Sequence, residues 1–177
     1  MDAMVFKHSS RDLVVDIHVD DPIALGPGND VSWFFDAASK YMLLRADDEV
    51  KVGDEFKYLG RRYLRTESGF RRMAGAGYIE HTIELAGFRD LKPANTPGVA
   101  SAKQSEEDPV LDESDHRRRL GSVVGRLLFL AGDRPDIQYS VKELARTLHA
   151  PTEYSWAQLK RCLRYLQGTR DFCYDIK

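Results

Sequence analysis

The first part of the chain has the apolar pattern of a β-hairpin. Residues 12–19 (Asp-Leu-Val-Val-Asp-Ile-His-Val) are rich in β-branched side chains, which favour strands. The run stops at Asp20 and Asp21, and Pro22 opens a second apolar run that ends at Gly26. The pattern predicts two paired strands with acidic residues at their turn.

Helical spacing follows the turn-forming residues Gly-Pro-Gly-Asn-Asp at 26–30. Apolar residues then recur every three or four positions, which predicts an amphipathic helix. They are Val31, Phe34, Phe35, Ala38 and Met42. Asp30 precedes this stripe, and Asp is favoured at the residue that caps a helix N-terminus. We therefore predict Asp30 as the N-cap.

Short extended runs replace the helical spacing between residues 49 and 73. They cover residues 49–52, 56–64 and 70–73, and Gly53-Asp54 or Ser68-Gly69 separates them. Short runs that end at Gly, Asp or Ser are typical of hairpins. We predict a small antiparallel sheet here.

A short helix and a connector are expected next. Ile79, Ile83 and Ala86 form one apolar stripe, and Gly87 is a natural helix end. Residues 92–114 then contain three prolines and many small or acidic residues, which predicts a long exposed linker.

Three further helices are predicted toward the C-terminus. Their apolar stripes cover residues 120–131, 137–148 and 156–166. Pro135 suits a first helical turn, Thr152 suits an N-cap, and Gly168 suits a helix end.

Composition narrows the function only slightly. The chain of 177 residues has 26 Lys and Arg against 28 Asp and Glu, so no global charge attracts nucleic acid or membrane. Cys162 and Cys173 cannot form a metal framework by themselves, and a reduced thiol is the simplest expectation. No apolar run approaches the roughly 20 residues of a membrane helix. We expect a soluble, intracellular protein of the cytoplasm or nucleus with no membrane partner.

The acid pair is the strongest chemical signal. Adjacent carboxylates at Asp20 and Asp21 repel each other unless cations compensate, and carboxylate oxygens suit Mg²⁺. A magnesium site is therefore one interpretation. The other is a solvated Asp-Asp turn, since Asp favours tight bends.

Motifs in a fixed order resemble the C-terminal part of a reverse transcriptase of the copia-type LTR retrotransposons. Residues 13–21 resemble its catalytic hairpin, and residues 56–60 (Phe-Lys-Tyr-Leu-Gly) resemble its primer-grip turn. Tyr78-Ile79 resembles the start of a thumb helix. The later motifs are Lys-Pro-Ala-Asn-Thr-Pro at 92–97, the apolar run 121–131, Arg-Pro-Asp-Ile at 134–137, and Trp156 with residues 160–169. Together they cover nearly the whole chain.

The resemblance implies an α+β fold made of two family regions. Residues 1–74 would be the C-terminal half of a palm, an antiparallel sheet with a helix that carries the catalytic hairpin and the primer-grip strands. Residues 75–177 would be a helical thumb and connection, with the exposed linker at about 92–114.

The resemblance also implies two-metal phosphoryl transfer, with Asp20 and Asp21 as Mg²⁺ ligands and catalytic residues. A further metal-binding Asp lies on an earlier strand in the family. Asp2, Asp12 and Asp16 are the earlier acids here, and none lies in a matching sequence. We therefore expect this chain alone not to polymerise DNA, so its status as an enzyme is uncertain.

Contacts with an RNA or DNA primer–template are expected at two places. Lys57, Arg61, Arg62 and Arg65 alternate with tyrosines, which places cations for phosphates near rings. In the family, the residues equivalent to Tyr58, Leu59 and Gly60 hold the primer end. On the last helix, the cations opposite the apolar stripe are Lys160, Arg161 and Arg164. For both groups, ordinary solvation is the alternative.

Three functions compete at this stage. The first is a fragment of an RNA-directed DNA polymerase, which would work with the missing fingers and palm part of the Pol polyprotein. The second is a non-catalytic nucleic-acid-binding or interaction module with a vestigial acid pair. The third is a decayed fragment with no selected activity.

Overall fold

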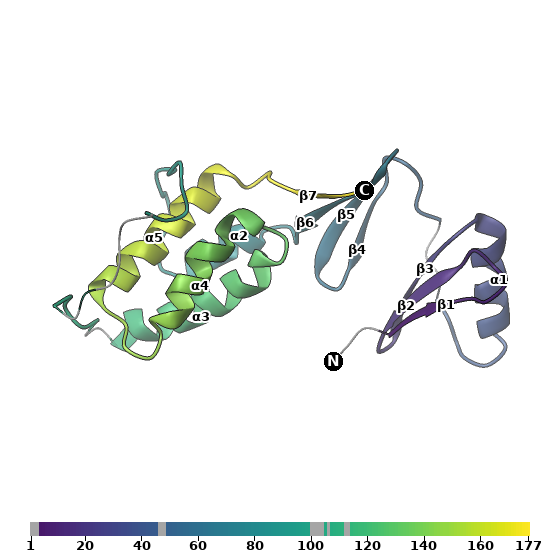
Figure 1. Cartoon of the computed structure of the whole chain (residues 1–177), viewed down its shortest axis with the longest axis horizontal. Coiled ribbons are helices and arrows are strands. Elements are labelled where there is room, and N and C mark those ends of the chain that lie inside the picture. The colour runs from purple at the N-terminus through teal and green to yellow at the C-terminus, as the bar shows by residue number, and fades with distance from the viewer. Residues whose placement is uncertain (1–3, 46–48, 100–104, 106, 112–113) are drawn as a thin grey trace. The chain divides into compact units, whose positions relative to one another are not determined.

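The chain forms two compact units in the computed structural model, which describes residues 4–45, 49–99, 105, 107–111 and 114–177 (Figure 1). Unit 1 covers residues 1–49 and unit 2 covers residues 50–177. The described residues form two antiparallel sheets and five α-helices, which confirms the predicted α+β class. The predicted palm and thumb regions, divided near residue 74, stay a prediction.

Unit 1 is a three-stranded antiparallel sheet with one helix. Its strands are β1 (Met4–Lys7), β2 (Val14–His18) and β3 (Asp21–Leu25), in that order across the sheet, and its helix is α1 (Gly28–Ala38). His18 pairs with Asp21, so Val19 and Asp20 form a two-residue turn. The predicted hairpin with an acidic turn is confirmed. The pairing of β1 with β2 was not predicted.

The start of α1 differs from the prediction. The helix begins at Gly28, its N-cap is Pro27, and no side chain caps it. Asp30 therefore lies in the first turn, and the prediction that it is the N-cap was wrong. The Pro27 carbonyl accepts hydrogen bonds from the backbone N–H groups of Asp30 and Val31, so the first turn of the helix forms before Asp30. Asp30 instead accepts a hydrogen bond of 2.7 Å from Arg11 Nη1.

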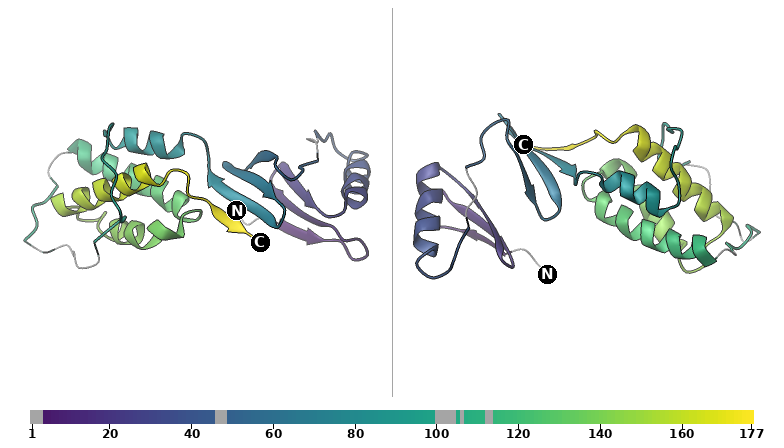
Figure 2. Two further views of the ribbon diagram at one scale, coloured as in Figure 1. Left: turned by 90° about the horizontal axis from the view of Figure 1, so that it is seen from above. Right: turned by 180° about the vertical axis from the view of Figure 1, so that it is seen from behind.

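Unit 2 contains a four-stranded antiparallel sheet built from distant parts of the chain. Its strands are β4 (Glu55–Tyr58), β5 (Arg61–Thr66), β6 (Gly69–Ala74) and β7 (Tyr174–Ile176), in that order. Figure 2 shows β7, in yellow, beside β6, and the register pairs Phe70 with Ile176. The last strand was not predicted.

Two of the predicted extended runs need correction. Residues 56–64 are two strands joined by a turn at Leu59 and Gly60. Residues 49–52 are not a strand, because the Asp54 carboxylate accepts a hydrogen bond from the Lys51 backbone N–H and bends the chain. The run 70–73 lies within β6, as predicted.

Helices make up the rest of unit 2. They are α2 (Tyr78–Leu85), α3 (Ser114–Ala131), the 3₁₀ turn η1 (Pro135–Ile137), α4 (Gln138–Arg146) and α5 (Glu153–Gly168). Thr152 caps α5 by accepting a hydrogen bond from the Ser155 N–H, which confirms the predicted N-cap. Gly168 ends the helix, also as predicted.

The apolar core of unit 2 lies among its helices. In α3, Leu120, Val124 and Leu127 have no exposed surface. They belong to one cluster with Val141 of α4 and Leu163 of α5. None of the helices in the described ranges is both long and apolar enough to cross a membrane.

The first part of the predicted linker is held against α5. Arg164 Nε donates a 2.7 Å hydrogen bond to the Lys92 carbonyl, and the Ala94 N–H donates a 3.2 Å bond to the Arg164 carbonyl. Several side chains of residues 92–99 are exposed, as expected of a linker. Positions 100–104, 106 and 112–113 of this linker lie outside the described residues.

Candidate acidic hairpin and basic turn

The hairpin of unit 1 presents two adjacent carboxylates at an exposed turn. Asp20 lies in the turn, and Asp21 begins β3. Both residues are exposed, which suits ligands of a hard cation that keeps several waters. Within the described part of the chain, no three His, Cys, Asp or Glu side chains are grouped so that they could hold a metal ion.

The backbone of this turn is strained at Val19. Its φ of 59° lies in the left-handed region, and its side chain is 69% exposed. This conformation costs an L-residue about 1–2 kcal/mol. Strain of this kind clusters at functional sites. The strained turn therefore supports a functional interpretation of the hairpin, in addition to its two acids.

A third acid of unit 1 lies on the same face of the sheet as Asp21. The register pairs Asp16 with Ile23 and His18 with Asp21, so these four side chains share one face of β2 and β3. Oδ1 of Asp16 is buried and has no hydrogen-bond partner within the described residues. A buried carboxylate oxygen without a donor is costly, so Asp16 weakens the unit rather than stabilising it.

A turn joins β4 and β5 at Leu59 and Gly60, within residues 56–60, which resemble a primer-grip turn. Leu59 and Gly60 have φ of 48° and 75°, so both are left-handed, as in the favoured two-residue hairpin turns. Of the residues expected to contact a primer, Tyr58 is only 9% exposed, Leu59 is half-buried and Gly60 is exposed. Gly60 is thus the most accessible residue of this turn. We call the turn at Leu59 and Gly60 the basic turn, because Lys57, Arg61 and Arg62 lie beside it in the chain.

A buried carboxylate anchors the basic turn to the end of α3. Arg61 Nε lies 2.8 Å from both Asp133 oxygens, and Arg72 Nε lies 2.8 Å from Oδ1. The Asp133 side chain is 1% exposed, against 21% for Arg61 and 24% for Arg72. Arg61 also stacks on Phe129, 4.3 Å from the ring centre. Sequence reasoning missed Asp133, because 72 residues separate it from Arg61.

The other predicted cations of the sheet differ in the groups that lie next to them. Arg62 donates a 2.6 Å hydrogen bond to Glu55, so its charge is partly neutralised. The Arg65 guanidinium lies 5.4 Å from the Phe70 ring centre. Lys57 is exposed, and the register places it opposite Arg62 on the same face. Lys57 is thus an exposed cation beside the basic turn that could contact phosphates, and Arg62 is a half-buried one.

Two of the three predicted cations on α5 bind the chain itself. Arg161 donates a 2.8 Å hydrogen bond to Thr96 Oγ1, and Arg164 donates to the Lys92 carbonyl. Lys160 is exposed, with its Nζ 5.2 Å from the Phe88 ring centre. Arg161 and Arg164 thus hold the segment that follows α2.

A polar network joins the start of η1 to the end of α5. Arg134 is 4% exposed and donates to Asp136 at 2.7 Å and to the Thr169 carbonyl at 2.8 Å. The Tyr165 hydroxyl donates to the same Asp136 carboxylate at 2.7 Å. Burial favours a higher pKa for Asp136, but the bonds from Arg134 and Tyr165 outweigh it and hold the pKa below its usual value. Two motifs of the resemblance, residues 134–137 and 160–169, thus meet in one structural network.

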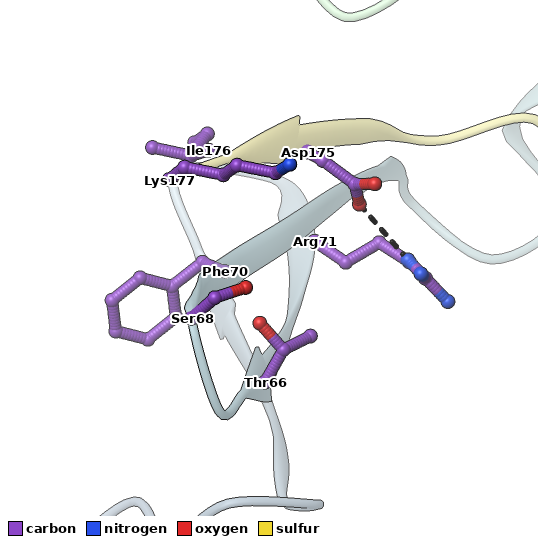
Figure 3. Close-up of a pocket in the computed structure, with 7 residues that line it drawn as sticks. All are labelled: Thr66, Ser68, Phe70, Arg71, Asp175, Ile176 and Lys177. Carbon is purple, nitrogen blue, oxygen red and sulfur yellow. Dashed lines mark hydrogen bonds and ion pairs between the residues drawn. The ribbon is translucent and has the colours of Figure 1, made fainter.

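A shallow pocket lies at the open end of the unit 2 sheet, between the β5–β6 turn and β7 (Figure 3). The ion pair between Arg71 and Asp175, with a distance of 3.1 Å, borders it. None of the predicted site residues lines the pocket. Its lining residues are Thr66, Ser68, Phe70, Arg71, Asp175, Ile176 and Lys177. This pocket is therefore separate from the basic turn.

The two cysteines are free thiols. Cys162 is fully buried in α5, and burial raises the pKa of its thiol to about 12. Such a thiol stays protonated and is a poor nucleophile and metal ligand. Cys173 is half-buried between α5 and β7 in the chain.

Comparison with known proteins finds relatives among transposon proteins. The chain is 30% identical over 166 residues to the "Retrovirus-related Pol polyprotein from transposon RE2" of Arabidopsis thaliana, covering 91% of this chain and 11% of that protein. It is 36% identical over 123 residues to the corresponding polyprotein from transposon RE1, covering 68% of this chain and 8% of that protein.

A yeast relative is similar over almost the whole chain. The "Putative transposon Ty5-1 protein" of Saccharomyces cerevisiae is 28% identical over 173 residues, which are 96% of this chain and 53% of that protein. This chain thus spans about a tenth of the two plant polyproteins and about half of the yeast protein. No family model and no solved structure matches it.

Proposed function

This chain belongs with the Pol polyproteins of retrotransposons as a homologue of one segment of them, and we propose that it forms part of a reverse transcriptase of the copia type. In this proposal, unit 1 is the part of the palm that carries the catalytic hairpin. The basic turn of unit 2 is the primer grip, and the helices that follow are the thumb and connection. The observation that carries the proposal is the strained, exposed turn that presents Asp20 and Asp21.

Asp20 and Asp21 would hold Mg²⁺ through their carboxylate oxygens. Their exposure and chemistry fit two of the ligands of such an ion, and other parts of the polyprotein would complete its coordination. When bound, paired ions would activate a primer 3′ oxygen and stabilise the leaving pyrophosphate. Gly60 allows close approach of a primer strand, while Lys57 and Arg62 would contact its phosphates.

The test is reconstitution with the rest of the polymerase. We expect the purified chain to incorporate no nucleotide alone, but to support incorporation on a primed RNA template once a fingers–palm fragment, Mg²⁺ and deoxynucleotides are added. Asp20→Asn and Asp21→Asn should each lower the incorporation rate by at least about 100-fold, because each removes a charge that would hold the metal. Incorporation is measured by primer extension.

Asp36→Asn is the matched control, since it removes an exposed acid of the same unit outside the hairpin. It should leave primer extension unchanged. Full activity of both hairpin variants in the reconstituted enzyme would refute the catalytic assignment. Primer extension by the chain alone, at a rate that both hairpin variants leave unchanged, would also refute it.

A non-catalytic nucleic-acid-binding module is the second candidate. It is favoured by one observation: the described residues hold no third ligand beside Asp20 and Asp21. In that case Lys57→Glu and Arg62→Glu would abolish binding of a labelled primer–template, while the hairpin variants would change neither binding nor Mg²⁺ affinity.

A further inference from the structure

One carboxylate joins the basic turn of unit 2 to the end of a core helix. Asp133 lies two residues after the end of α3, and its side chain is 1% exposed. It contacts Arg61, the first residue after the turn, and Arg72 on the neighbouring strand β6. Arg72 also donates a 2.7 Å hydrogen bond to the Gly132 carbonyl. Strands β5 and β6 are therefore both tied to Asp133, and β6 is also tied to Gly132.

We propose that Asp133 is a positioning residue, which fixes the basic turn against the end of α3 so that the turn can recognise the recessed 3′ end of a primer–template. The inference deepens the proposed function and rests on it, because a grip is useful only if this unit holds nucleic acid. Asp133 itself would not touch the nucleic acid, since it is buried beneath Arg61 and Arg72.

The free-energy cost of burying the Asp133 charge favours a positioning role over one that only holds the sheet and α3 together. Burying a charge is expensive, and an apolar contact of the same size usually joins two elements at least as stably. Unit 2 already has an extensive apolar core among its helices. The Nε–H of Arg61 is shared between both Asp133 oxygens, and such a charge-assisted hydrogen bond has a directional preference that apolar packing lacks. That hydrogen bond lies next to Gly60, where an added Cβ would meet only Phe129, at 4.0 Å.

The charge balance of the group suits contact with a phosphate. Two guanidinium groups share one carboxylate, so the three side chains carry a net charge of +1. The Arg72 Nε contact is close but poorly aligned, so that N–H has no hydrogen bond. Both arginines keep about a fifth of their side-chain surface exposed. The group thus keeps a positive charge at the turn while its position is fixed.

The experiment compares Asp133→Asn with wild type in the full chain. The first measurement is amide hydrogen exchange at Leu59, Gly60 and Arg61 without nucleic acid. The second is the affinity for a fluorescent primer–template with a recessed 3′ end, relative to a blunt duplex of the same length, at several salt concentrations. Asp115→Asn is the matched control, because Asp115 also pairs with two arginines but is exposed on α3.

We expect Asp133→Asn to speed exchange at the turn and to lower the preference for the recessed end by about 5–50-fold, within the usual range of coupling between sites. For this variant, the slope of log affinity against log salt concentration should steepen by the amount expected for about one more phosphate contact. The reason is that a guanidinium loses its internal partner and becomes free to contact a phosphate. Asp133→Glu should recover part of the preference. Asp115→Asn should change none of these quantities.

The measurements distinguish failure of the positioning role from failure of the proposed function. Unchanged exchange at residues 59–61 in Asp133→Asn would overturn the positioning role, whatever the nucleic acid does. Equal loss of affinity for both duplexes, without a change in preference, would also overturn it. If wild type binds neither duplex, the proposed function fails, and the role in recognition fails with it even where exchange increases.

Discussion

At the scale of single residues, Val19 adopts a backbone conformation that is unfavourable for its side chain. A β-branched residue gains nothing from a φ of 59° and a side chain that is 69% exposed. Glycine would adopt the same backbone without strain. We predict that Val19→Gly stabilises unit 1 by about 1 kcal/mol, the strain released less the entropy that glycine adds to the unfolded chain.

Urea unfolding measures this effect. Trp33 lies in unit 1 and Trp156 in unit 2, and they are the two tryptophans of the chain, so fluorescence in a Trp156→Phe background reports on unit 1. Val19→Ala is the control, because it shortens the side chain but keeps the unfavourable φ. A lower urea midpoint for Val19→Gly than for wild type would show that the turn is not strained.

The residue scale also shows what the sequence could not predict about the site. The acidic turn of the hairpin follows from the local pattern and lies where it was expected. The Leu59–Gly60 turn interrupts a run that the local pattern predicted as continuous, and only the family resemblance indicated a turn there. Asp133 follows from no local pattern, since its partners Arg61 and Arg72 reach it only through the folded chain. The same holds for Arg161 and Arg164, whose partners lie in the preceding linker.

At the scale of elements, the network of Asp136 joins the start of η1 to the end of α5. The folded-state pKa of Asp136 is lowered, chiefly by Arg134 and Tyr165 against the opposing effect of burial. Its stabilisation is therefore complete above the unfolded pKa of about 3.9 and is lost as the pH falls through the lower folded value. We predict that Asp136→Asn costs about 2 kcal/mol at pH 7, as expected for bonds to a charged group.

The pH dependence separates this network from ordinary packing. Trp156 fluorescence in a Trp33→Phe background reports on unit 2 during urea unfolding. The difference in unfolding free energy between wild type and Asp136→Asn should be constant from pH 7 to about pH 5 and should shrink below about pH 4. Tyr165→Phe, which removes one of the donors, should lose about 1 kcal/mol at pH 7. A difference that stays constant down to pH 2 would contradict the assignment.

Elements were predicted well where the apolar spacing was long and regular. The stripes of α3, α4 and α5 extend over several turns, so they predicted helices that the structure confirms. The strands β1 and β7 have only 4 and 3 residues, too few to show an alternating pattern, and they form because a partner strand is available. Residues 49–52 have the apolar spacing of a strand, but Asp54 turns the chain there.

At the scale of the whole molecule, the two units differ in the size of their cores. The buried apolar residues of unit 1 are Leu13 and Val15 within the part that is described, whereas the core cluster of unit 2 contains 18 buried residues. Small cores support little stability. We predict two unfolding transitions in urea, with the Trp33 signal changing at a lower concentration than that of Trp156. Coincident transitions in the two single-tryptophan backgrounds would contradict this expectation.

The pairing of β7 with β6 has a consequence for synthesis on the ribosome. Strand β6 ends at Ala74, and its partner begins at Tyr174, roughly 100 residues later. At translation rates of about 5–20 residues per second, the β6 edge waits roughly 5–20 seconds for that partner to be made. During this interval an unpaired edge can recruit strands from neighbouring nascent chains. The Arg71 and Arg72 side chains on this edge carry positive charge, which would keep identical edges apart until β7 arrives.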